Sequence, residues 1–86
     1  MHAAYLEFAS EAIDYLSAAG AVATARDIAA RVMEVDPEAR EIEFKLVRLY
    51  WRLGARSAAA AQYEHMVGQD RADGIEPPDL RQIVDT

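Results

Sequence analysis

The chain has 86 residues, enough for one small domain, and 18 of them are alanine, so its core is expected to bury little apolar area. Its net charge of −6 disfavours nucleic-acid binding by the chain as a whole, because neutralisation of phosphates dominates that affinity. The absence of cysteine excludes disulfides and thiolate metal sites, and no stretch has the length and apolarity of a membrane span.

The first half of the chain predicts a helical hairpin. Apolar residues recur at helical spacing over residues 3–19, and Gly20 ends this helix because glycine tolerates the left-handed conformation of a helix end. The residues at this spacing are Tyr5, Phe8, Ala12, Ile13 and Leu16. A second helix is expected over residues 22–35, before the break at Asp36-Pro37. The tyrosines Tyr5, Tyr15 and Tyr63 are expected to pack with their hydroxyls reaching water.

The second half predicts another hairpin and a short final helix. A helix is expected to begin at Pro37 and run over residues 37–53, since proline suits a first helical turn, and Gly54 ends it. The next helix is expected over residues 55–70. A polar link and the paired prolines at 77–78 forbid helix until Asp79, after which apolar residues return at helical spacing. These residues are Leu80, Ile83 and Val84.

The two halves match each other at a spacing of 34 residues. Gly20 recurs as Gly54, Ala25 as Ala59 and Asp36 as Asp70. This period, with a central glycine, is typical of helix-turn-helix solenoids. We therefore predict one all-α domain over 1–86: a tetratricopeptide-like solenoid with repeats at about 6–39 and 40–73, and a capping helix at about 78–85. The predicted capping helix continues the 34-residue repeat, because Leu80 lies 34 residues after Leu46.

Two families share these motifs. The second repeat resembles a tetratricopeptide repeat at Tyr50, Gly54, Ala59 and Tyr63. Nearly the whole chain resembles the bacterial transcriptional activator domain of actinobacterial antibiotic-regulatory proteins, in segments 36–41, 46–50, 54–56 and 74–81. The most specific of these is the Gly-Ile-Glu-Pro-Pro-Asp-Leu stretch at 74–80. The position before Gly74, commonly leucine in the family, is aspartate here.

The resemblance implies a function in transcription. In that family the helical domain commonly follows a winged-helix DNA-binding domain and is taken to mediate oligomerisation or contact with other proteins. We therefore expect a protein-interaction or oligomerisation module of a transcriptional regulator, with its DNA-binding part supplied elsewhere. The partner is then the transcription machinery or a second copy. The alternative is a stand-alone peptide-binding adaptor. A cytoplasmic location is expected, since the first residues lack a secretory signal.

Catalysis, metals and cofactors are not expected. The two histidines, His2 and His65, lack the paired ligands at helical spacing that a metal site needs. No serine lies in a nucleophile-elbow motif, and the isolated glycines form no phosphate-binding loop. The sequence therefore predicts a binding protein without enzymatic activity.

The candidate site is a stripe on the third helix. Phe44, Arg48 and Trp51 share one face at spacings of four and three, and Arg52 adjoins them. In tetratricopeptide stacks such positions line the concave groove, where Glu7 and Asp14 of the first helix would lie opposite. Aromatic residues with arginine are common interface anchors. In the competing interpretation the final helix covers this stripe, with Ile75, Leu80 and Ile83 packed on Phe44 and Trp51.

Basic residues concentrate in the segment from Arg40 to Arg56. The five are Arg40, Lys45, Arg48, Arg52 and Arg56. One interpretation is that they pair with acidic residues on adjacent helices. The other is a nucleic-acid strip, against which the overall charge argues.

Overall fold

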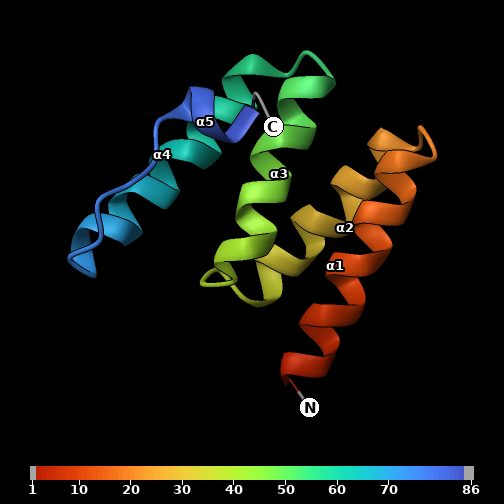
Figure 1. Cartoon of the computed structure of the whole chain (residues 1–86), viewed down its shortest axis with the longest axis horizontal. Coiled ribbons are helices and arrows are strands. Elements are labelled where there is room, and N and C mark those ends of the chain that lie inside the picture. The colour runs from red at the N-terminus through yellow and green to blue at the C-terminus, as the bar shows by residue number, and fades with distance from the viewer. Residues whose placement is uncertain (1, 85–86) are drawn as a thin grey trace.

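A computed structural model describes residues 2–84, with side chains from residue 4 onward, and all the regular structure in this part of the chain is helical. The predicted all-α class is therefore confirmed. The helices are α1 (His2–Ala18), α2 (Val22–Val35), α3 (Arg40–Arg52), α4 (Arg56–Ala72) and α5 (Leu80–Val84). In Figure 1, α3 lies in the middle, with α1 and α2 on one side and α4 and α5 on the other.

The α1–α2 and α3–α4 corners are closed by the same backbone hydrogen bonds. The amides of Gly20 and Ala21 donate to Ser17 and Leu16 in the first corner, and the residues 34 positions later repeat both bonds. Gly20 and Gly54 have φ angles of 88° and 77°. This left-handed conformation carries no Cβ penalty for glycine. The two glycines thus occupy equivalent corners.

The start of α3 differs from the prediction. Asp36 accepts the backbone amide of Glu38 on its carboxylate (3.2 Å) and that of Ala39 on its carbonyl (3.1 Å). These bonds close a turn over residues 36–39, and α3 begins at Arg40. The prediction that Pro37 begins this helix was therefore wrong, because the local side-chain bond favours a turn.

The first apolar cluster joins α1 and α2 to α3. Its buried members are Ala9, Ile13, Ala25, Ala29, Val32, Met33, Ala39, Ile42, Leu46 and Leu49. Four of the ten are alanines, so the helices approach closely while each alanine buries little area.

The second apolar cluster repeats the first at the 34-residue offset. Its buried members are Val47, Ala59, Met66 and Ile83, which correspond to Ile13, Ala25, Val32 and Leu49 of the first. The partly buried Leu80 and Val84 of α5 pack on the same cluster. α5 therefore lies against α3 and α4 in the register in which α3 lies against α1 and α2.

The two hairpins differ where their second helices end. α4 continues to Ala72, whereas the residue 34 positions after the last residue of α2 is Gln69. Gly74, with a φ of 73°, ends α4, and the link that follows runs back along this helix to α5 (Figure 1). The Tyr63 hydroxyl donates a hydrogen bond to the Pro78 carbonyl at 2.7 Å, which holds the link. α5 begins directly after Asp79, as the prolines predicted.

None of the helices in residues 2–84 combines the length and apolarity required to cross a bilayer.

Candidate functional site: an acidic cleft and an exposed aromatic face

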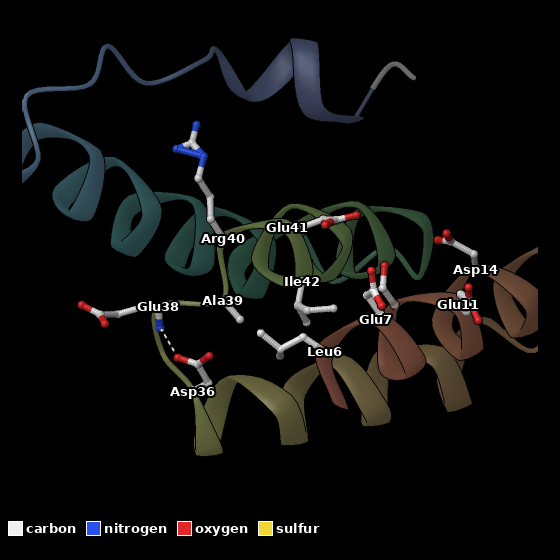
Figure 2. A pocket seen from close by; sticks show the side chains of 11 residues that line it. Leu6, Glu7, Glu11, Asp14, Asp36, Glu38, Ala39, Arg40, Glu41 and Ile42 are labelled. Atoms are coloured by element: carbon white, nitrogen blue, oxygen red, sulfur yellow. Dashed lines mark hydrogen bonds between the residues drawn. The ribbon is translucent and has the colours of Figure 1, made fainter. Parts of the chain in front are cut away.

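An open cleft of about 690 Å³ lies between α1 and the start of α3. Figure 2 shows its apolar floor, formed by Leu6, Ala39 and Ile42. Six acidic side chains surround this floor: Glu7, Glu11, Asp14, Asp36, Glu38 and Glu41. The cleft therefore combines an apolar base with a strongly negative rim.

The basic groups nearest the cleft are engaged in other contacts. Arg40 turns its side chain away from the floor (Figure 2) and bonds the buried Asp70 through Nη1, at 2.5 Å from Oδ1. Its guanidinium also lies 4.9 Å from the ring centre of Phe44. Lys45 Nζ lies 2.5 Å from Asp14 Oδ1. Lys45 thus neutralises Asp14, whereas Glu7, Glu11 and Glu41 have no ion-pair partner among the described residues.

The six predicted groove residues do not form one groove. Glu7 and Asp14 line the acidic cleft. Phe44 and Trp51 pack against the second apolar cluster, together with Leu80 of α5. The final helix therefore covers the aromatic stripe, as the competing interpretation held. Ile75, which that interpretation also placed on the stripe, is 46 % exposed and lies outside the cluster.

The arginines of the stripe also bond within the molecule. Arg48 Nε donates to the Ile83 carbonyl at 3.0 Å, and Arg52 Nη1 donates to Ser17 Oγ at 2.6 Å. The Arg56 guanidinium lies 3.7 Å from the ring centre of Trp51. All five basic residues from Arg40 to Arg56 therefore have intramolecular contacts. Two of them, Arg40 and Lys45, pair with acids on other helices, so the predicted complementarity of charges holds for these two.

A polar cluster around the buried Glu43 joins α3 to α4. Glu43 is 2 % exposed, and its Oε2 accepts a hydrogen bond from Gln62 Nε2 and lies 2.6 Å from His65 Nδ1. The periodicity of the sequence did not reveal this cluster, since Glu43 corresponds to Ala9 in the first hairpin. His65 thus has a carboxylate partner from another helix. Residues 4–84 contain no group of three side chains suited to a metal ion, and the side chain of His2 lies outside the described residues.

An aromatic face on α1 was not predicted as a site. Phe8 is 75 % exposed, Tyr15 73 % and Tyr5 42 %. The expectation that Tyr5 and Tyr15 are packing residues whose hydroxyls reach water was therefore wrong, because both side chains are exposed. Tyr5 and Phe8 border a shallow cavity of about 670 Å³ whose other wall is α2, including Ile28 and Arg31. The 34-residue repeat could have identified this face from the sequence. Phe8 corresponds to Ile42, which is buried against the first hairpin, and no earlier hairpin in the described chain covers Phe8 in the same way.

No family model matches this chain, and neither the curated proteins nor the solved structures contain a match. The resemblance to the bacterial transcriptional activator domain therefore depends on the sequence motifs alone.

Proposed function

We propose that the chain is a protein-interaction module that binds a basic segment of a partner protein in the cleft between α1 and α3. The observation that carries this proposal is that Glu7, Glu11 and Glu41 lie around an apolar floor and have no ion-pair partner within the part of the chain that the structure describes. Lysine and arginine side chains suit such a site, because their apolar stems cover the floor while their charged ends reach the rim.

The scaffold in this proposal is a tetratricopeptide-like repeat. It is supported by the matching glycine corners and by two apolar clusters related by the 34-residue offset. In such repeats, the first helices of successive hairpins line the groove. Here α1 and α3 are the first helices of the two hairpins, and the acidic cleft lies between them. The function is then recognition, and the proposal includes no catalytic step.

The resemblance to the transcriptional activator domain supports a setting in a cytoplasmic transcriptional regulator. The cleft would then hold a segment of the transcription machinery, while a winged-helix domain supplied elsewhere reads the DNA. Two of the five basic residues, Arg40 and Lys45, are paired with acids, which reduces the positive charge that this segment offers to phosphates and agrees with this division. The alternative, a stand-alone peptide-binding adaptor, uses the same cleft. A winged-helix sequence in the same gene would favour the regulator.

The test is a binding titration with a fluorescent Lys/Arg-rich peptide, followed by anisotropy. The double variant Glu7→Gln/Glu11→Gln is expected to weaken binding roughly three- to tenfold, as for the loss of two exposed charge contacts. The matched control is Glu64→Gln/Glu76→Gln, which changes the net charge equally but alters residues outside the cleft. Equal weakening by both variants would show a non-specific charge effect and contradict the proposal.

A further inference from the structure

We propose that the aromatic face of α1, formed by Tyr5, Phe8, Ala12 and Tyr15, is the interface of a two-fold symmetric dimer of this chain. The face is apolar and largely open to solvent, and its residues follow the alternating spacing of three and four that is typical of a helix–helix seam. Exposed aromatic residues in such a pattern mark interaction surfaces.

The corresponding face of the second hairpin shows what this kind of surface contacts. The residues 34 positions later are Ala39, Ile42, Leu46 and Leu49, all 7 % exposed or less. They are buried against α1 and α2 in the first apolar cluster. In the second hairpin this face therefore packs against a neighbouring hairpin. Within residues 2–84, no hairpin packs against the same face of α1.

The occupant that fits is the same face of a second copy. A head-to-tail arrangement would need the outer surface of the second hairpin, which is the counterpart of the α1–α2 surface on which α3 packs. α5 already covers that surface, because Leu80 and Ile83 pack there with Val47, Ala59 and Met66. Assembly through the open end alone joins two like faces and closes after two copies. This geometry requires a surface that is complementary to itself.

The face meets this requirement in shape and in charge. In an antiparallel pairing of two α1 helices about an axis that crosses the face midway between Phe8 and Ala12, the ring of Phe8 lies beside the small Ala12 of the second copy. Ile28 of α2 borders the same cavity as Phe8 and Ala12, so the axis also passes near Ile28. Asp27 and Arg31 flank Ile28, and the axis brings each Arg31 within reach of Asp27 in the second copy. Arg31 has no ion-pair partner among the described residues, whereas Asp27 is 2.8 Å from Arg26.

The test is sedimentation of the whole chain from about 5 to 500 µM, the range in which a modest interface dissociates. A concentration-dependent dimer is expected. Phe8→Glu is expected to weaken it at least tenfold without loss of helicity, because Phe8 is three-quarters exposed. The control is Ile75→Glu, which adds the same charge at an exposed position in the link after α4 and is expected to leave the dimer unchanged.

A charge exchange tests the two-fold pairing itself. Asp27→Arg and Arg31→Asp are each expected to weaken the dimer several-fold, and the double variant is expected to recover most of the loss. A chain that remains monomeric throughout this range would contradict the proposal, since the face would then serve another helix. A dimer that Phe8→Glu leaves intact, or a double variant without recovery, would also overturn it. The acidic cleft is a separate surface, so peptide binding by Phe8→Glu distinguishes failure here from failure of the proposed function.

Discussion

Gly54 and Gly68 are expected to respond in opposite ways to replacement by alanine, because Gly54 closes a corner and Gly68 lies within a helix. A Cβ at either position would meet nothing within 4 Å, but only Gly54 has a positive φ, of 77°. Gly54→Ala is therefore expected to lower the free energy of unfolding by about 1–2 kcal/mol, the cost of a left-handed non-glycine residue. Gly68→Ala, within α4, is expected to raise it by about 0.5–1 kcal/mol through helix propensity. Urea unfolding measures the free energy change in both variants. Changes of the same sign would contradict the left-handed corner assigned to Gly54.

The ion pair between Arg40 and Asp70 depends on burial. Asp70 is 3 % exposed, and its Oδ2 already lacks a hydrogen-bond partner among the described residues. Arg40→Ala is expected to cost about 2–4 kcal/mol of stability, because it leaves a buried carboxylate without its cation. The estimate lies toward the lower end of such losses because the Arg40 side chain is itself 39 % exposed.

The control for this prediction is Arg26→Ala. It removes the same side chain from an ion pair in which Asp27 is 69 % exposed, and it is expected to change stability by less than about 1 kcal/mol. Chemical denaturation of the two variants side by side gives the comparison. Similar losses would mean that burial of Asp70 contributes little.

At the scale of the elements, α5 has only five residues, but three of them, Leu80, Ile83 and Val84, contribute to the second cluster or pack on it. Ile83 is 2 % exposed, and Ile83→Ala is expected to destabilise the chain by about 2–4 kcal/mol through the cavity it leaves. Trp51, the single tryptophan, packs on the same cluster, so its emission is expected to shift to longer wavelength as α5 loosens. Ile75→Ala is the control, because Ile75 is 46 % exposed. If the free energy of unfolding of Ile83→Ala equalled that of the unaltered chain, α5 would not be a stabilising cap.

Helix ends could be predicted where one residue decides them. Gly20 and Gly54 each fix a corner through their own backbone conformation, and the second helix was predicted with the bounds 22–35 that α2 has. The start of α3 could not be predicted in this way. Two tendencies compete at Asp36-Pro37, and the hydrogen bond of the Asp36 carboxylate to the Glu38 amide decides between them. Whether that hydrogen bond forms depends on the three-dimensional geometry of the turn, which the preferences of single residue types do not specify.

The candidate site was predicted less well, because periodicity identifies the face of a helix but not its neighbour. Phe44 and Trp51 share a face as predicted, yet α5 lies over them. Tyr15 has the spacing of a packing residue and is 73 % exposed. Of the six predicted site residues, Glu7 and Asp14 line the acidic cleft, since their charge keeps them at a surface whichever helix is adjacent. Contacts between distant segments, such as Glu43 with His65, have no local signal at all.

At the scale of the whole molecule, the two hairpins are fastened differently. In the second, Arg40–Asp70 joins the start of α3 to the end of α4, and Glu43 bonds Gln62 and His65 farther along. The side-chain bonds of α1 lead instead to α3, through Asp14–Lys45 and Ser17–Arg52. α3 is therefore the element to which both halves are attached.

This asymmetry determines how the molecule yields to mechanical force. Tension applied at its two ends reaches α1 first on one side, where two exposed side-chain bonds and an alanine-rich contact resist it. On the other side the force first meets α5 and the link before it, which are held by the bonds of Arg48 to Ile83 and of Tyr63 to Pro78. The polar bonds between α3 and α4 lie behind these outer elements, so α1 and α5 are expected to detach while α3 and α4 stay joined.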